Sequence, residues 1–268
     1  MGMVAALPVI LQLLVVLAGV ITLAILLHRR LPEQWRTWGF GALTFILSQV
    51  ARLPLLSAAT ALISVVLTPA HPAFVLTVAG IQLATSGLFE EGARYIVMRW
   101  LARHVRTWRS GVMFGAGHGG IEAILVFTLS AISTVVLLTS GDAIIQQTQA
   151  AAPQQAQAVI AQIQALRAGS PWWLYAAGVF ERVPAIALHI LWSVWVMRAV
   201  RGDGIQWLLG AMLMHIAVNT ISVLVLQRFG VIATEAAVGV FGLLAVYLTL
   251  SQRRRNPAPV SANPPEPA

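Results

Sequence analysis

The residues that could do chemistry are acids and histidines that interrupt long apolar runs. Glu90 and Glu91 are adjacent, His118 is followed four residues later by Glu122, and His189 lies alone in a later run. An ionised side chain at the centre of a bilayer costs roughly 2.5 to 3.5 kcal/mol on insertion scales, so such residues are rare in spans and mark functional sites. We interpret them as a candidate reaction centre within the membrane.

Helical spacing places several of these residues on shared faces. His118 and Glu122 are four residues apart, as are His215 and Asn219, so each pair lies on one face of its helix. Arg182 precedes His189 by seven residues and shares its face.

Glu90 and Glu91 point about 100° apart on a helix, so only one of them can face the centre of the bundle. The other is expected to pair with Arg94, which offsets the cost of its burial. We expect Arg52 to be a counter-ion to one of the buried acids.

Such a cluster could activate water in a place where water is scarce. Neutral imidazoles bind zinc, a bound metal makes water nucleophilic, and a nearby carboxylate can act as general base. Without metal, a buried carboxylate beside a histidine could activate water directly. Asn219 could donate a hydrogen bond to the oxyanion of a tetrahedral intermediate. The residue types alone leave both routes open.

The elements that must position these residues are long apolar helices. The 268 residues are 58% hydrophobic and 10% charged, with a mean hydropathy of +0.81, unlike a soluble domain. Runs that reach the roughly 20 residues needed to span a bilayer cover 4–27, 39–67, 73–101, 111–139, 172–197, 205–226 and 231–250. We predict an all-α fold, a single polytopic transmembrane bundle of about seven helices over residues 1–252, with the second run as one helix kinked at Pro54.

The basic residues indicate an orientation. All 17 are Arg, and outside the spans only Arg167 and Arg228 fall on the side opposite to the others. The positive-inside rule then predicts that the N-terminus is outside and the C-terminus inside, with a disordered cytoplasmic tail at 253–268. The first run has no basic segment before it, so we expect a retained helix rather than a cleaved signal peptide. The expected location is a bacterial plasma membrane, as a multi-pass protein.

Charge and cysteine content exclude several functions. The net charge of +8 is spread over helix ends as a topogenic signal, unlike a nucleic-acid-binding patch, so the expected partners are the lipid bilayer and a membrane-associated substrate, and no nucleic acid. Because the chain has no cysteine, it forms no disulfide and has no thiol nucleophile, and a metal must be held by nitrogen and oxygen ligands.

Counting from the Arg-rich helix ends at 1.5 Å per residue places the polar groups at one depth. The distances are about 13 Å for Glu90, 12 Å for His118, 13 Å for His189 and 15 Å for His215. We therefore expect four helices to converge on one site, which opens toward the Arg-rich half. Four nearby glycines, at positions 115, 117, 119 and 120, should allow close helix approach and leave room for a substrate backbone.

One segment, 141–171, does not follow the membrane pattern. It is rich in Gln and Ala, and its second half places Val159, Ile160, Ile163 and Leu166 on one helical face. It is expected to be a linker helix or, alternatively, a lid on the outer membrane surface.

The order of the polar residues resembles a known pattern. Intramembrane proteases of the CAAX-protease and bacteriocin-processing superfamily carry two glutamates followed by an arginine, then Phe-x-x-x-His, then His-x-x-x-Asn on a later helix. The matching positions here are Glu90 and Glu91 with Arg94, Phe114 with His118, and His215 with Asn219. The segment GHGGIEAI at 117–124 is similar to the YhfC-type family of bacterial membrane metalloproteases. One departure is that two residues, and not three, separate the second glutamate from the arginine.

The resemblance implies a hydrolase, a protease that cleaves a membrane-associated protein or peptide within or near the bilayer. The candidate catalytic residues are Glu90, Glu91, His118, Glu122, His215 and Asn219, with Arg94, Phe114 and Arg182 in supporting positions. The expected cofactor is a divalent metal, zinc in the first place, with His118, His189 and His215 as candidate ligands. Two alternatives stay open: a glutamate-type protease without metal, and an ion- or proton-coupled transporter with a buried Glu/His cluster.

Overall fold

The computed structural model describes residues 2–69, 71–151 and 153–253. The regular structure of these residues is helical throughout and contains seven α-helices and one π-helical turn. The elements are α1 (Gly2–Arg30), α2 (Trp35–Val66), α3 (Pro72–Ile96), η1 (Val97–Leu101), α4 (Trp108–Ala151), α5 (Pro153–Ala168), α6 (Trp172–Arg201) and α7 (Gln206–Arg253). All of the α-helices except α5 are long and apolar enough to cross a membrane, which makes six candidate spans. Apart from Arg253, the tail predicted to be disordered lies outside the described residues.

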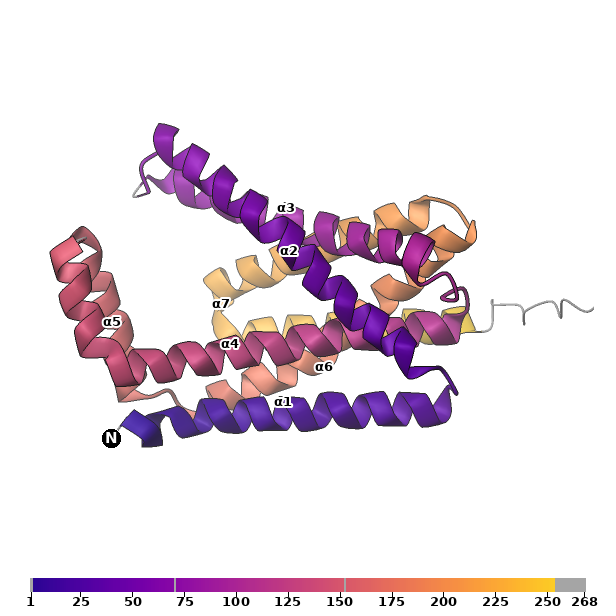
Figure 1. The fold of residues 1–268 in the computed structure, drawn as a ribbon, viewed down its shortest axis with the longest axis horizontal. Coiled ribbons are helices and arrows are strands. Elements are labelled where there is room, and N and C mark those ends of the chain that lie inside the picture. The colour runs from indigo at the N-terminus through magenta and orange to yellow at the C-terminus, as the bar shows by residue number, and fades with distance from the viewer. Residues whose placement is uncertain (1, 70, 152, 254–268) are drawn as a thin grey trace, which may run out of the picture.

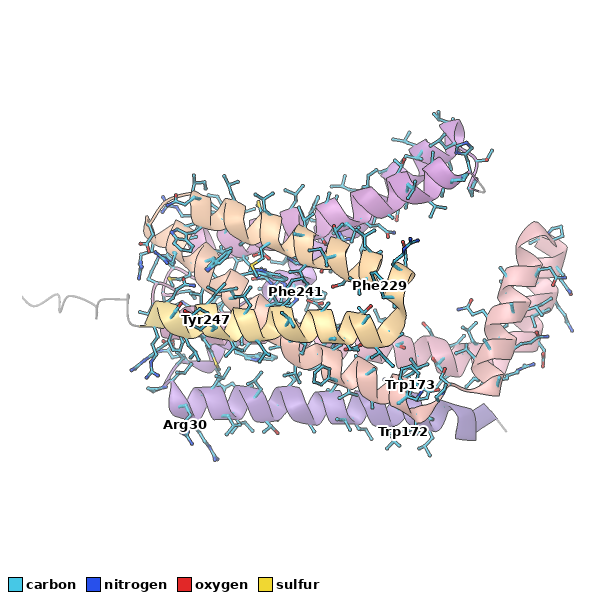
Figure 2. All side chains as sticks on the ribbon, turned by 180° about the vertical axis from the view of Figure 1, so that it is seen from behind. Arg30, Trp172, Trp173, Phe229, Phe241 and Tyr247 are labelled. Carbon is cyan, nitrogen blue, oxygen red and sulfur yellow. The ribbon has the colours of Figure 1, made fainter. Side chains whose placement is uncertain are left out.

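The last long helix, α7, reverses direction at Gly230. This residue has φ 80° and ψ −177°, a conformation that glycine adopts at little cost because it has no Cβ. Figure 2 shows the turn beside Phe229 and the second half running back past Phe241 and Tyr247. The two halves cover the last two predicted runs, 205–226 and 231–250, so six long helices account for seven predicted runs.

The helices share two ends (Figure 1). We call one the Arg-rich end: there α1 ends, η1 is followed by α4, and α6 is followed by α7. We call the other the Arg-poor end: it holds α5, the end of α2, the start of α3 and the turn at Gly230. Figure 2 labels Arg30 at the first end and Trp172 and Trp173 at the second. The N-out, C-in orientation of these ends stays a prediction.

Helix α4 is the central element, and its glycines are packing positions. A Cβ on Gly117 would lie 2.0 Å from the carbonyl oxygen of Trp38 in α2, and one on Gly115 would lie 2.5 Å from the Cα of Ile190 in α6. Residues 111–120 are all buried as a result. The close approach of helices is as predicted. The expectation that these glycines leave room for a substrate backbone is wrong, because neighbouring helices fill that room.

An apolar core fills the half of the bundle next to the Arg-rich end. It is built from η1, α4, α6 and α7, and Met98, Phe114, Leu191 and Met197 in it have no exposed surface. This core lies between the Arg-rich end and the level of the predicted polar cluster.

The segment predicted as a linker or lid forms a hairpin with α4. Helix α4 continues to Ala151, and α5 folds back so that Ile163 is fully buried beside Gly141. Arg167 donates a hydrogen bond of 3.0 Å to Asp142 across the hairpin. The predicted apolar face of α5 therefore packs on the extension of α4.

Candidate active site

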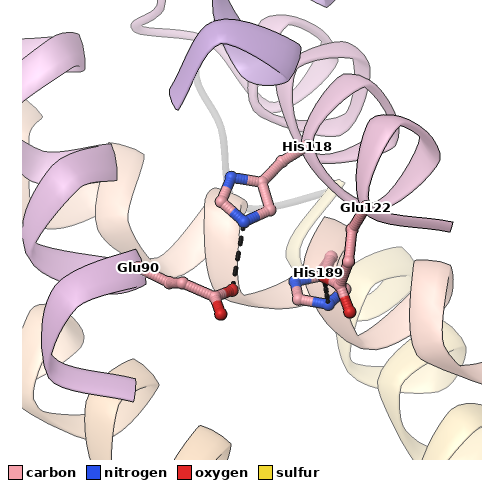
Figure 3. Close-up of side chains that lie close together, drawn as sticks. All are labelled: Glu90, His118, Glu122 and His189. Atoms are coloured by element: carbon pink, nitrogen blue, oxygen red, sulfur yellow. Dashed lines mark hydrogen bonds and ion pairs between the residues drawn. The ribbon is translucent and has the colours of Figure 1, made fainter. Parts of the chain in front are cut away.

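Four side chains from three helices meet inside the bundle. Glu90 of α3, His118 and Glu122 of α4, and His189 of α6 each offer one nitrogen or oxygen atom, and these atoms all lie within 4.8 Å of one another (Figure 3). We call these four residues the Glu/His cluster. The depth count had placed the polar residues of these three helices at a common level, and the structure brings their side chains together.

Glu90 faces the cluster without an arginine partner among the described residues. Its Oε2 lies 3.1 Å from Nε2 of His118, and its Oε1 accepts a hydrogen bond of 3.4 Å from Gln49. The side chain of Arg52 donates to Gln49, to Thr85 and to the carbonyl oxygen of Gln82. Arg52, which we expected to be a counter-ion to a buried acid, therefore lies near Glu90 but reaches it through Gln49 and not by a direct ion pair.

Glu91 turns away from the cluster and pairs with Arg94, as the offset of 100° between the two glutamates predicted. Nδ1 of His215 lies 2.9 Å from Oε1 of the same carboxylate. Glu91 and Arg94 are both fully buried, so each supplies the charge that the other needs away from water.

Arg94 also reaches His189, and this contact defines the histidine tautomer. Nη2 of Arg94 lies 2.6 Å from Nδ1 of His189, and because a guanidinium only donates, Nδ1 must accept. The hydrogen of a neutral His189 is then on Nε2, which lies 2.7 Å from Oε2 of Glu122. Glu122 also lies 3.9 Å from Arg182, which forms an ion pair with Glu181.

Aromatic rings enclose the histidines, and the sequence analysis missed them. Trp192 stacks on His215 with ring centroids 4.1 Å apart and 11° between the planes, and it meets His189 edge-on at 5.0 Å. Phe45 meets His118 edge-on at 5.4 Å. The signal for Trp192 was its position three residues after His189, on the same helical face.

The remaining predicted residues have different surroundings. Asn219 donates a hydrogen bond of 3.0 Å to Ser86 and is partly buried. His215 is buried beside the cluster, 5.6 Å from the His189 ring, and is not one of its four members. Phe114 is fully buried in the apolar core and does not line the cavity described next.

A cavity of about 500 Å³ extends from the cluster toward the Arg-poor end. Phe45 and Trp192 form the floor of the cavity, at its inner end. From the cluster, the rest of the lining extends toward the Arg-poor end along five helices, α2, α3, α4, α6 and α7. The residues that mark this course are Arg52 on α2, Gln82 and Ser86 on α3, Val126 on α4, Glu181 and Arg182 on α6, and Asn219 and Ser222 on α7. On the other side of the cluster lies the apolar core. The expectation that the site opens toward the Arg-rich half is therefore wrong.

The cluster fits a divalent metal in its donor types. Two imidazoles and two carboxylates are ligands that zinc takes, and ligand atoms around tetrahedral zinc lie about 3.3 Å apart given bonds of 2.0–2.2 Å. Because the four atoms lie up to 4.8 Å apart, the widest pair would have to close by about 1.5 Å around a metal. A cation would also compensate Glu90, which no arginine contacts among the described residues. One contact must change: a neutral His189 bound to metal through Nε2 carries its hydrogen on Nδ1, so Arg94 has to move away from that atom.

Comparison with known proteins places the chain in a family. It matches the family described as YhfC intramembrane metalloprotease over residues 13–241, a range that contains every residue of the cluster. It is 36% identical over 185 residues to a protein of Bacillus subtilis (strain 168) named "Uncharacterized membrane protein YhfC". The aligned part covers 63% of this chain and 66% of the Bacillus protein. No solved structure matches the chain.

Proposed function

Because the chain belongs to the YhfC intramembrane metalloprotease family, we propose that it is a peptidase whose active site is the Glu/His cluster. The observation that carries the proposal is the convergence of two carboxylates and two imidazoles at the inner end of a polar cavity, which Glu90, Glu122 and His189 line, inside an apolar bundle. Four titratable groups, three of them buried and Glu122 partly buried, are costly in such a position, and hydrolysis gives each of them a role.

In this proposal His118, His189 and Glu122 hold the metal, a two-histidine, one-carboxylate set of the kind used in hydrolytic zinc sites. When bound, a divalent metal makes water nucleophilic and polarises the carbonyl of the scissile bond. Arg182 lies 3.9 Å from Oε1 of Glu122, whereas His189 lies beside Oε2, so Arg182 would orient this carboxylate. Arg94 would leave Nδ1 of His189 when the metal binds and keep its ion pair with Glu91.

Glu90 is the proposed general base. It faces the cavity, no arginine within the described part of the chain holds its charge in an ion pair, and Gln49 orients one of its oxygens. It would take a proton from the attacking water and return it to the leaving amine. Asn219 lines the same cavity, and only one of its two amide hydrogens is used by Ser86, so the other could donate to the developing oxyanion.

The apolar core next to the cluster weighs against a transport path. A transporter needs polar access from both ends, whereas the described residues beyond the cluster toward the Arg-rich end are tightly packed and, apart from the buried Glu91–Arg94 ion pair and a few buried hydroxyls, apolar. The protease without metal would use the same residues, and metal content separates it from the proposal.

The first test is elemental analysis of detergent-purified wild type, His118→Ala and His215→Ala, never exposed to chelator. About one divalent metal per chain is expected in wild type and in His215→Ala, because His215 lies outside the cluster, and none in His118→Ala. Loss of metal from both variants would instead support the three histidines predicted from the sequence, His118, His189 and His215, as the ligands. Absence of metal from all three would support the metal-free reaction.

The second test is cleavage of a quenched fluorescent peptide library by the protein in proteoliposomes. Wild type should cleave, and His118→Ala should not, with an unchanged melting temperature as the control for folding. Equal cleavage by the two proteins would remove the proposed function.

A further inference from the structure

We propose that the site receives its substrate from the Arg-poor side of the membrane, as a short unwound peptide segment. This inference rests on the proposed function and adds the side of access and the class of substrate. By the distribution of arginines, that side is the outer one.

The first argument is that the two sides of the cluster are built differently. Toward the Arg-rich end, Met98, Leu191 and Met197 have no exposed surface, and Trp192 has 2%. Toward the Arg-poor end, Gln82 is exposed and Arg52, Glu181 and Asn219 are partly exposed, all of them lining the cavity. A peptide can therefore reach Glu90 through the second half without unpacking the core.

The second argument is the chemistry of the lining. The wall between the cluster and the Arg-poor end carries side chains of both charges together with amides and two hydroxyls. These groups can hydrogen-bond the exposed N–H and C=O groups of an extended backbone. Lipid chains have no N–H or C=O groups that require hydrogen-bond partners, and an intact helix already pairs its own backbone groups internally.

The third argument is size. A spanning helix is about 30 Å long and 10–12 Å across, which gives a cylinder several times larger than the cavity of about 500 Å³. Cavities of this volume are typical of sites for small ligands and short segments. We infer that the substrate is a loop, a tail or the unwound end of a helix on the Arg-poor side.

The natural absence of cysteine makes this inference testable with single introduced thiols. Ala185 and Ala187 are neighbours on α6, but Ala185 lines the polar cavity whereas Ala187 lines a separate apolar groove with Pro184 and Leu243. The experiment measures the labelling rates of Ala185→Cys and Ala187→Cys by a small, charged, membrane-impermeant methanethiosulfonate. It is done in membrane vesicles of both orientations.

Thiols at two exposed positions show which side of the membrane the reagent reaches in each vesicle preparation. Ser140→Cys lies near the Arg-poor end of α4, and Ser251→Cys lies near the Arg-rich end of α7. We expect Ala185→Cys to react at least tenfold faster than Ala187→Cys, and only from the side that labels Ser140→Cys. Reaction from the side that labels Ser251→Cys would overturn the inference, as would equal slow reaction of both alanine positions.

A cleavage readout then separates this inference from the proposed function. Peptides added on the Ser140 side should be cleaved, and prior labelling of Ala185→Cys from that side should reduce the cleavage. Cleavage only of peptides added on the Ser251 side would overturn the side of access while the peptidase stands. Labelling from the Ser140 side without cleavage on either side would remove the peptidase, and with it the substrate class, while leaving the measured opening.

Discussion

The two halves of the bundle are formed largely by the same helices but differ in packing: one is a solid core and the other encloses a cavity. Between the Glu/His cluster and the Arg-rich end, α4 and α6 are packed on every side, and ten consecutive residues, 111–120, are buried. On the other side of the cluster the same helices line a cavity, and α6 exposes Phe180 at 53% and Val183 at 69%. The cluster lies where one half changes into the other. A packed floor holds the reactive groups in position, and a hollow wall gives access to them.

The largest expected effect is on the reactive side of this boundary. We predict that Glu90→Gln lowers kcat for peptide cleavage by about 10⁴-fold while metal content stays at the wild-type level, because an amide cannot accept the proton from water. Glu181→Gln, the same change at the cavity wall, should keep kcat within a few-fold. Loss of metal from Glu90→Gln would show that Glu90 is a ligand and not the base.

The next effect is on the cavity wall beside the cluster. We predict that Asn219→Ala lowers kcat by about 10²- to 10³-fold with little change in KM, the loss found when one oxyanion donor is removed. Ser86→Ala, which removes only the hydrogen-bond partner of Asn219, should cost less than tenfold. Equal losses in the two variants would mean that Asn219 acts only through Ser86.

The packed side should respond in stability rather than in chemistry. A Cβ on Gly41 would lie 1.9 Å from the carbonyl oxygen of Phe114, whereas one on Gly39, two residues earlier in α2, meets no atom within 4 Å. We predict that Gly41→Ala lowers the free energy of unfolding by about 2–3 kcal/mol. Gly39→Ala should leave it unchanged or raise it by up to about 1 kcal/mol. Melting temperatures in detergent measure both, and equal stabilities would contradict this packing.

The smallest effect is at the surface of the Arg-rich end. Asp203 accepts hydrogen bonds from Arg201 at 2.6 and 3.0 Å and from Arg198 at 2.9 Å. The hydrogen bonds from Arg201, opposed by partial burial and helped by Arg198, lower the pKa of the Asp203 carboxyl below its ordinary value of 3.8. Since the folded protein then holds this proton less tightly than the unfolded chain, the stabilisation is present at neutral pH and is lost as pH falls below about 4. We predict that Asp203→Asn costs about 0.5–1 kcal/mol at pH 7. The difference between the melting temperatures of variant and wild type should shrink as pH falls below about 4, and a difference that does not change with pH would refute the role of the charge.

Much of the fold could be predicted from the sequence because a bilayer leaves few solutions. Apolar runs must be helices, since every backbone group has to be satisfied without water, and the six long helices lie where the runs predicted them. The polar residues stood out for the same reason. The depth count also succeeded for Glu90, His118 and His189, because the rise per residue of a helix is nearly constant.

The rest depended on how the helices are rotated and splayed, which the sequence pattern does not give. The direction of the cavity follows from where α2 and α3 leave the bundle, and close contacts such as Gly41 on Phe114 set that position. The contact from Arg94 to His189 joins two helices that are far apart in the chain. Gln49, which lies between Arg52 and Glu90, could not be recognised because a single amide in an apolar run has no distinctive spacing. The likeness to the wider superfamily stays a prediction from the motifs.

The packed floor has a kinetic consequence. If the proposed peptidase admits its substrate through the cavity, the packed floor means that both fragments would leave by the route that brought the substrate in. A fragment that lingers then occupies the place of the next molecule, so cleavage products should act as competitive inhibitors. In the proposed peptidase, substrates that leave short, weakly held fragments would therefore be turned over fastest.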